Sequence, residues 1–268
     1  MFIKLTLHRI KTEWWKIFLL LAFVTFYLWS MISQIPSIKY DTFMRDYGDL
    51  SADRVANVFG IEVEGSAEMY DVYQEYISTF REFFYTKPID NSVTVIILLG
   101  LFLSVLMICS LFNNRSVSSM LQSGCSRGSI FISLTATYYL SAIVIWFLAT
   151  AAVRGYYSVE FLPQERSYFL TTYLSWLIMV LATVSIPYLA AFIFHNAMPT
   201  VLVGLGATIF FRNVLPRHIA PSKVMANNAY WRMDADMNLL LRADIISIGI
   251  IVAAVVVAYI FFKRKGQK

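Results

Sequence analysis

The hydrophobic residues of this chain are gathered into long stretches that carry no charged residue between their ends. The stretches are Ile17–Ile38, Asn91–Asn114, Gly128–Val153, Ile245–Phe262 and the longest one, from Ser167 to Arg212. About 20 apolar residues in a helix cross the hydrocarbon core of a bilayer once. The longest stretch is interrupted by the polar pair His195-Asn196, and Pro199 suits the first turn of a new helix, so this stretch predicts two crossings joined by a tight turn.

The pattern predicts an all-α integral membrane protein with six transmembrane helices. The expected spans are residues 17–34, 92–112, 129–152, 168–194, 198–212 and 245–262. The expected cytoplasmic segments are an N-terminal amphipathic interface helix at 1–16, a coupling loop at 113–128, a turn at 195–198 and a basic tail at 263–268. The expected extracellular segments are one sizeable loop domain at 35–91 and two further loops at 153–167 and 213–244.

The distribution of charge gives this orientation, with both termini in the cytoplasm. The segments assigned to the cytoplasm hold ten Lys and Arg residues and a single acid, Glu13, whereas the opposite side holds more acids than bases. Cytoplasmic loops of membrane proteins carry an excess of Lys and Arg. With 58% hydrophobic and 15% charged residues, the composition also excludes an ordinary soluble enzyme and a disordered chain.

Motifs for nucleotide or metal chemistry are missing from the sequence. There is no GxxxxGK[ST] loop and no HExxH pair, and the three histidines are scattered along the chain. Two cysteines, Cys109 and Cys125, are too few for a disulfide framework. No acid or base lies inside a predicted span, although ion-driven carriers usually keep one there. We therefore expect no catalysis and no cofactor in this chain, and we expect any energy for transport to come from a partner.

Two segments outside the spans show apolar residues at helical spacing. At the N-terminus, the residues expected to face the membrane are Ile3, Leu7, Ile10, Trp14 and Trp15. The alternative is a plain basic flank that sets the topology. Residues 66–85 predict a helix with an aromatic stripe that includes Tyr70, Tyr73, Tyr76 and Phe80. The stripe is interpreted either as a surface for a substrate or the bilayer, or as a helix packed over the ends of the bundle.

The short loop at 113–128 is the most informative polar segment. Ser116–Gln122 predicts a two-turn helix along the membrane surface that is stopped by Gly124. A helix of this kind can enter a groove on a soluble motor and pass its motion to the neighbouring spans. The alternative is a basic turn that only sets the topology. The candidate coupling residues are Arg115, Ser119, Met120, Gln122, Gly124, Ser126 and Arg127.

The loop also resembles that of the ABC-2-type transporter permeases. The residues that carry the resemblance are Ser123, Gly124, Ser126, Arg127, Gly128 and Ile130, leading directly into a span. Six spans, an N-terminal amphipathic helix, cytoplasmic termini and a basic tail are similar to the same family. The long first extracellular loop departs from its simplest members.

The resemblance implies a permease subunit that pairs with a second permease chain, identical or homologous. It further implies a separate ATPase subunit, with ATP and Mg in that partner, and export of a hydrophobic or amphipathic cargo such as a peptide antibiotic, a bacteriocin or a drug. Such subunits lie in the bacterial cell membrane, in contact with lipids, and no nucleic acid is expected as a partner.

Other interpretations stay open at this point. The chain is alternatively a membrane sensor or assembly protein that binds partners through its acidic extracellular loop, or, as a third class, a membrane-embedded enzyme. Gly204 and Gly206 on the fifth span predict close helix contact, either between two chains or within one chain.

Overall fold

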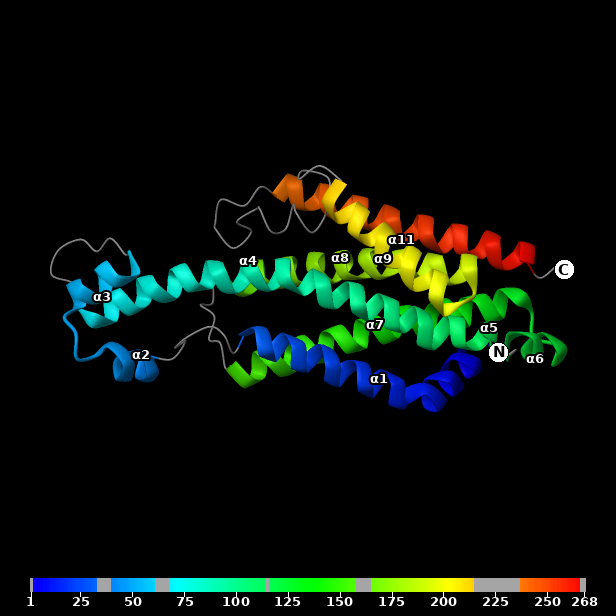
Figure 1. Cartoon of the computed structure of the whole chain (residues 1–268), viewed down its shortest axis with the longest axis horizontal. Coiled ribbons are helices and arrows are strands. Elements are labelled where there is room, and N and C mark those ends of the chain that lie inside the picture. Colours follow the sequence, from blue (N-terminus) through cyan, green and yellow to red (C-terminus); the bar gives the residue numbers. More distant parts are fainter. Residues whose placement is uncertain are drawn as a thin grey trace.

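The computed structural model describes residues 2–32, 40–60, 68–113, 116–157, 165–214 and 237–265. Every regular element within these ranges is a helix, which confirms the all-α class (Figure 1). The elements are α1 (Phe2–Ile32), α2 (Tyr40–Tyr47), α3 (Ala52–Phe59), α4 (Met69–Leu103), the π-helix η1 (Ser104–Cys109), α5 (Ser110–Asn113), α6 (Ser116–Gln122), α7 (Arg127–Tyr157), α8 (Glu165–Phe194), α9 (Ala197–Val214) and α11 (Met237–Lys265).

Within the described ranges, four helical segments are long and apolar enough to cross a membrane. They are Thr94–Asn113, Arg127–Ala151, Leu174–Phe194 and Leu241–Arg264. Two further apolar segments, Trp14–Trp29 in α1 and Ala197–Phe210 in α9, are shorter. A helix satisfies its backbone hydrogen bonds internally, as the bilayer requires. The chain is therefore a membrane-embedded helical protein, while six crossings and their orientation stay predictions.

Two helices continue across boundaries that the hydrophobic pattern suggested. α1 joins the expected interface helix and the expected first span into one helix. α4 begins at Met69, in the expected extracellular domain, and runs to Leu103, where η1 follows directly. Hydrophobicity marks which part of a helix suits the bilayer, but polar residues continue a helix equally well. The pattern therefore could not show where these helices end.

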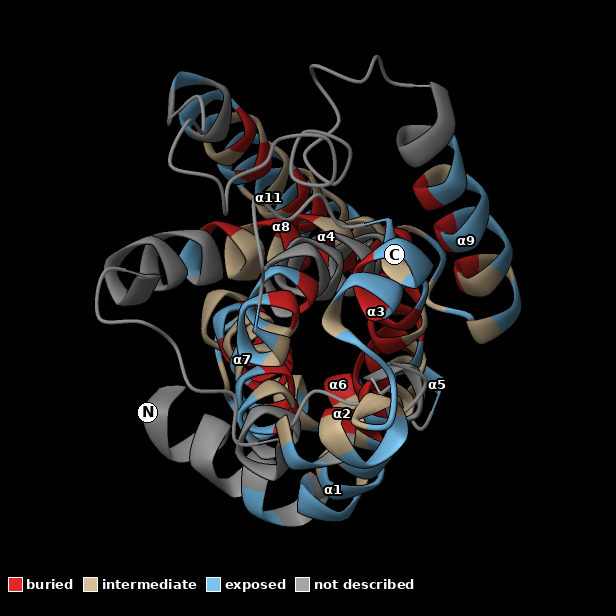
Figure 2. Cartoon of the chain, turned by 90° about the vertical axis from the view of Figure 1, so that its left-hand side faces the viewer, coloured by how far each residue is buried: buried red, intermediate tan, exposed pale blue. Residues whose placement is uncertain are grey.

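α8 makes the most extensive contacts in the helix bundle. It packs against α4, α9 and α11, whereas α1 packs mainly on α7. Figure 2 shows buried residues concentrated at the centre of the bundle, with exposed residues on the outer sides of α9 and α11. The α11 segment is the least enclosed, since 22% of its apolar window is buried against 56–61% for the other three. Most of α11 is thus left for lipid or for another chain.

Glycine lets α4, α8 and α9 approach closely around Pro187 of α8. A Cβ added at Gly100 of α4 would lie 2.9 Å from Pro187 Cγ, and one at Gly204 of α9 would lie 3.2 Å from Pro187 Cα. A Cβ at Gly206 would meet nothing within 4 Å. Gly204 therefore serves packing within the chain, and Gly206 lies on an open face.

A second core lies outside the bundle, in what we call the aromatic unit: residues 40–60, which contain α2 and α3, and residues 68–76, which contain the start of α4. Its buried side chains are Phe43, Val55, Ala56, Val72 and Tyr76. The helices are held by local signals. Gly60 ends α3 in the left-handed conformation at φ 65°, and Glu68 and Asp71 form a reciprocal capping box at the start of α4.

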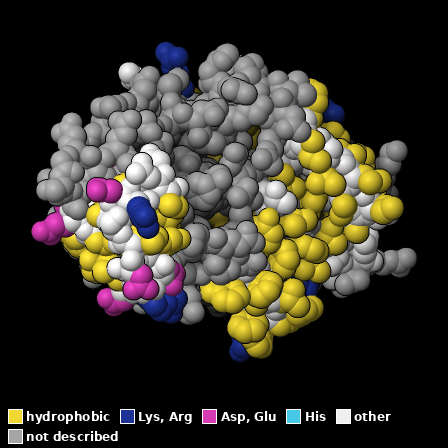
Figure 3. Space-filling view, turned by 60° about the vertical axis from the view of Figure 1, so that its left-hand side comes forward, with side chains coloured by type: hydrophobic (Ala, Val, Ile, Leu, Met, Phe, Trp, Pro, Cys, Tyr) yellow, Lys and Arg dark blue, Asp and Glu magenta, His cyan; other side chains and the backbone are white. Residues whose placement is uncertain are grey.

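Different structural elements lie at the two ends of the molecule. The aromatic unit lies at one end in Figure 1. The first turns of α1, the last turns of α11 and the short helix α6 lie at the other, which we call the elbow end. Figure 3 shows the acidic side chains gathered on the aromatic unit, whereas the bundle presents a broad hydrophobic surface. The exposed acids of the unit are Asp41, Asp46, Asp49, Asp53, Glu68, Asp71 and Glu75.

Candidate functional site

The segment from α6 to the first turn of α7, which we call the elbow, has both of its helix ends capped. α6 occupies Ser116–Gln122, the residues predicted for it. Gly124 adopts φ 85°, and the N–H groups of Gly124 and Cys125 donate to the carbonyls of Leu121 and Met120 at 3.1 Å each. This is the Schellman arrangement that ends a helix. A four-residue turn then leads into α7.

Ser126 caps the start of α7. The backbone N–H of Ser129 donates to Ser126 Oγ at 3.2 Å, three residues along the chain. Residues 124–128 also spell Gly-x-Ser-x-Gly, a pattern found at nucleophile turns between a strand and a helix. Here the segment joins two helices, and the hydrogen bonds of the Ser126 side chain go to Ser129. Ser126 therefore acts as a helix cap.

α6 has one face in the bundle and one face open. Val117 is buried, and Met120 and Leu121 pack against the bundle core. Ser119 and Gln122 are exposed. Of the candidate coupling residues, the structure therefore leaves Ser119, Gln122, Gly124 and Ser126 on the surface and uses Met120 for attachment. Arg115 lies outside the described residues.

Arg127 connects the elbow to α11. Its guanidinium donates from Nη1 to the carbonyl oxygen of Lys263 at 3.4 Å, in the last turn of α11. That carbonyl belongs to the C-terminal turn of a helix, where cations are favoured. The neighbouring Lys263 and Arg264 are exposed, so basic side chains gather at this point of the elbow end.

The N-terminal interface residues are placed only in part. Ile3, Leu7 and Ile10 lie in the helical backbone of α1, but their side chains are outside the described residues. Trp14 and Trp15 are 61% and 52% exposed, as interfacial aromatics are. The neighbouring Lys16 reaches into the bundle, where its ammonium donates to the carbonyl of Leu106 at 2.9 Å.

The Leu106 carbonyl belongs to η1, which sequence reasoning missed. A π-helix shifts the hydrogen-bond register and occurs often at functional sites. Ser110 Oγ bonds the same Leu106 carbonyl, and Cys109 Sγ lies 3.4 Å from Thr200 Oγ1 of α9. Nothing in Ser104–Cys109 distinguishes it from an ordinary apolar helix, so no sequence signal could have located it.

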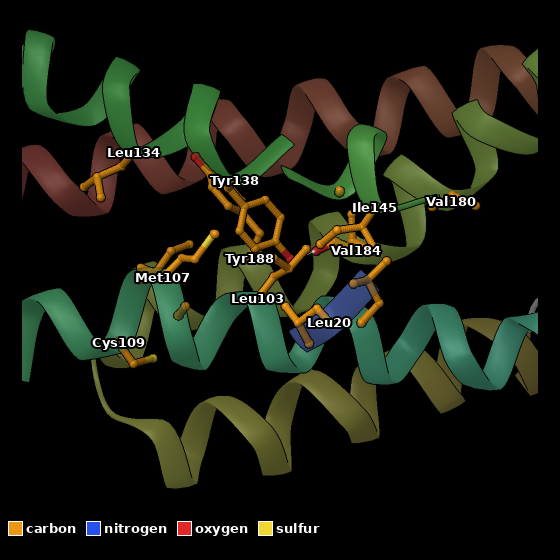
Figure 4. Packing of buried hydrophobic residues seen from close by; sticks show 14 of the residues in the cluster. Leu20, Leu103, Met107, Cys109, Leu134, Tyr138, Ile145, Val180, Val184 and Tyr188 are labelled. Atoms are coloured by element: carbon orange, nitrogen blue, oxygen red, sulfur yellow. Dashed lines mark hydrogen bonds between the residues drawn. The ribbon is translucent and has the colours of Figure 1, made fainter. Parts of the chain in front are cut away.

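Next to η1, buried hydroxyls join α7 to α4 and α8, and we call this set the hydroxyl seam. Tyr138 OH lies 2.8 Å from the carbonyl of Val184, 3.2 Å from that of Gly100 and 3.2 Å from Ser104 Oγ. Figure 4 shows the Tyr138 ring beside Tyr188 in the packed core. Two further pairs extend the seam: Thr135 with Tyr188 at 2.6 Å, and Tyr139 with Ser185 at 2.7 Å.

The aromatic stripe forms a core rather than an exposed surface. Tyr76 is 2% exposed and its ring lies 4.5 Å from that of Phe59, while Tyr73 lies 5.2 Å from Phe43. Tyr70 is half exposed, and the side chain of Phe80 is outside the described residues. Both interpretations of the stripe missed its partners, which are α2 and α3. These helices precede the stripe in the chain, in a part of the expected extracellular loop domain for which the sequence predicts no helix.

Burial controls the chemistry of Tyr76. Desolvation, with smaller contributions from Tyr47 and Asp46, raises the pKa of Tyr76 to about 12.

Among the residues that the structure describes, no three of His, Cys, Asp and Glu come together as metal ligands would.

Comparisons with known proteins returned no relative. No family model matches the chain, and neither the curated proteins nor the solved structures include a match.

Proposed function

We propose that this chain is the membrane-spanning subunit of an ATP-driven exporter of the ABC-2 type, with the ATPase docked at the elbow. The observation that carries the proposal is the form of α6. It is a short helix between two membrane helices, capped at its C-terminal end, fastened to the core through Val117 and Met120, and open to solvent at Ser119 and Gln122.

A displacement of α6 can be transmitted directly to the helices of the bundle. The four-residue turn after α6 passes the movement to α7, and α7 carries α1 because those two helices pack together. Arg127 passes it to the last turn of α11. The elbow thus contacts helices on both sides of the bundle, which is what a coupling element requires.

In the proposed cycle, the bundle rearranges at the hydroxyl seam. Its bonds join α7, which packs with α1, to α4 and α8. Interhelical hydrogen bonds inside membranes contribute only about 0.6 kcal/mol each on average, so one set can be exchanged for another. η1 lies at the same level and lets α4 change its register locally. The proposed cycle alternates between two such packings with different cargo affinity.

In this proposal the chain itself performs no catalysis. ATP and Mg²⁺ bind the partner ATPase, and a second permease chain, identical or not, completes the path through the bacterial cell membrane. The apolar helix surfaces fit a hydrophobic or amphipathic cargo, such as a peptide antibiotic or a drug, better than a small ion. Export follows from the resemblance to the ABC-2-type permeases, and the distribution of Lys and Arg favours an elbow end in the cytoplasm.

Copurification from native membranes tests the proposal. A soluble protein with a P-loop should accompany the chain in stoichiometric amount. Arg127→Glu and Ser119→Glu should each lower its recovery by about tenfold or more, because a charge placed in an interface costs several kcal/mol. Asn57→Glu on the exposed face of α3 is the control and should leave recovery unchanged. An intact, monodisperse chain without an ATPase would refute the proposal.

A sensor is the second candidate, and the aromatic unit favours it. The unit has its own core and seven exposed acids, so it can present a binding surface independently of transport. Replacing residues 40–76 with a flexible linker separates the two functions. A sensor should lose its response completely, whereas a transporter subunit should keep the basal activity of its ATPase.

A further inference from the structure

Asp244 lies in an unusual place for a carboxylate. α11 begins at Met237 and its apolar window begins at Leu241, so Asp244 is about one turn inside a helix suited to the bilayer. Its side chain is half-buried. An ionisable group at this depth is costly, and such residues usually mark a functional site.

The partner of Asp244 is a hydroxyl and not a base. Ser175 of α8, which is 2% exposed, donates from Oγ to Asp244 Oδ2 at 2.8 Å. Among the described residues no Lys, Arg or His forms an ion pair with Asp244. The hydrogen bond from Ser175 fixes the position of the carboxylate, but a hydroxyl supplies no positive charge to balance it.

A second polar group lies one turn further along the same face of α11. Ser247 is 1% exposed, and its Oγ has no hydrogen-bond partner among the described residues. A buried hydroxyl without a partner is unfavourable, so a hydrogen-bonding ligand at this position would be stabilised. Asp244 and Ser247 together therefore offer a carboxylate oxygen and a hydroxyl oxygen as acceptors.

An apolar strip on the exposed side of α11 begins beside Asp244. Leu241, Ile245 and Ile248 are 59%, 59% and 48% exposed, and Val252 and Val256 continue the strip along α11. α11 is also the least buried of the four membrane-length segments. A molecule in the bilayer can therefore lie along this helix with its polar head at Asp244.

We propose that Asp244, positioned by Ser175 and assisted by Ser247, binds the ammonium head of a cationic amphiphile whose chain lies along α11. A primary ammonium carries three N–H donors, which suit a carboxylate and a hydroxyl, and a charge-assisted hydrogen bond is about twice as strong as a neutral one. The amine of a phosphatidylethanolamine and the amine of a cargo molecule share this chemistry. The inference does not depend on ATP-driven transport.

Tryptophan fluorescence of the full chain in a neutral detergent provides the test. Trp176 follows Ser175 in the chain and stacks edge-on against Trp146, with ring centroids 4.9 Å apart, so a ligand at Asp244 should change its emission. Dodecylamine is titrated against dodecanol, which has the same chain and partitions into the micelle but carries no charge. Dodecylamine should bind at least about tenfold more tightly.

Matched variants decide whether Asp244 is responsible. Asp244→Asn keeps the size and the bond from Ser175 but removes the charge, so the preference for dodecylamine should be lost. Asp244→Glu keeps the charge and should retain the preference in part. Asp49→Asn changes an exposed acid of the aromatic unit and should bind as the original chain does. Equal affinities for the two ligands, or an unchanged preference in Asp244→Asn, would overturn the proposal.

Nanodiscs separate the two sources of the ammonium group. In discs that contain phosphatidylethanolamine, weaker binding of dodecylamine than in pure phosphatidylcholine would identify the lipid amine as the occupant. Equal binding in the two kinds of disc would favour a soluble amphiphile. Because the chain is tested alone, failure here would leave the proposed docking of an ATPase untouched.

Discussion

The aromatic unit and the membrane bundle both bury tyrosine, but the buried side chains form different kinds of contact. In the aromatic unit, Tyr76 packs its ring against Phe43 and Phe59, at centroid distances of 5.2 and 4.5 Å. In the bundle, Tyr138 places its hydroxyl between the carbonyls of Gly100 and Val184, so it links three helices. Tyr76 thus contributes ring contacts within its unit, whereas Tyr138 also contributes hydrogen bonds between helices.

The difference follows from the solvent that surrounds each unit. The aromatic unit carries the exposed acids of a surface that faces water, where burying apolar rings is strongly favourable. Lipid tails are as apolar as leucine, so helices inside a bilayer gain little from hiding apolar area and depend on close packing and hydrogen bonds. The same residue type therefore contributes through its ring in one unit and through its hydroxyl in the other.

The largest effect is expected from removing a ring in the aromatic unit. Phe43→Ala should destabilise the unit by about 3–5 kcal/mol, because Phe43 is fully buried. Hydrogen exchange should accelerate across residues 40–60 while the melting temperature of the bundle stays the same. Val58→Ala, at a 67% exposed position of α3, is the control. If the bundle melts earlier as well, the two units do not fold independently.

The next largest loss of stability is expected from adding a side chain where two bundle helices approach each other closely. Gly100→Ala should cost about 1–3 kcal/mol, because the new Cβ would lie 2.9 Å from Pro187 Cγ and 3.0 Å from Val184 Cα. Gly206→Ala adds the same methyl group to an open face of α9 and should leave the stability unchanged or slightly raised. Thermal unfolding in detergent compares the two variants, and equal losses would contradict the packing described around Pro187.

Removing one hydroxyl from the bundle should have a smaller effect. Tyr138→Phe keeps the ring and deletes the bonds to Gly100 and Val184, at a cost of about 0.6 and at most roughly 1.7 kcal/mol. Tyr259→Phe is the control, since Tyr259 is 41% exposed and keeps its ring contact with Phe131. If the two variants unfold at the same temperature, the hydroxyl seam does not contribute to stability.

The smallest effect on stability at neutral pH is expected from changes at Tyr76. A tyrosine in an unfolded chain has a pKa near 10, whereas the pKa of Tyr76 is raised to about 12. The unfolded state therefore loses its proton first as the pH rises, so the contribution of Tyr76 to stability is full below pH 10 and is lost between pH 10 and about 12. Tyrosinate absorbance and exchange over residues 40–60 should change together, and Tyr76→Phe should remove the dependence.

The sequence predicts the elements whose signals are local. Charge-free stretches locate the four long membrane helices, and the pair His195-Asn196 marks the turn between α8 and α9, where His195 has φ 57°. The bounds of α6 follow from its polar composition and from Gly124. Each of these signals lies within the element that it defines, so no knowledge of the packing is needed.

The contacts between elements were not predictable in the same way. The partners of Tyr76 come from α2 and α3, and Tyr138 bonds to backbone carbonyls that carry no sequence signature. Asp244 was placed at the edge of a span, and its bond to Ser175 emerges only when α8 and α11 are paired. Such contacts depend on how helices distant in sequence come together, and hydrophobic periodicity does not contain that information.

The continuity of α4 has a mechanical consequence. Its 35 residues, at about 1.5 Å each, form a rod of roughly 50 Å that begins in the aromatic unit and ends at η1 inside the bundle. The helix joins the two units without an intervening loop. A force applied to the aromatic unit is therefore transmitted along α4 to η1, the π-helical segment that follows it. At η1 the ammonium group of Lys16 donates a hydrogen bond to the carbonyl of Leu106.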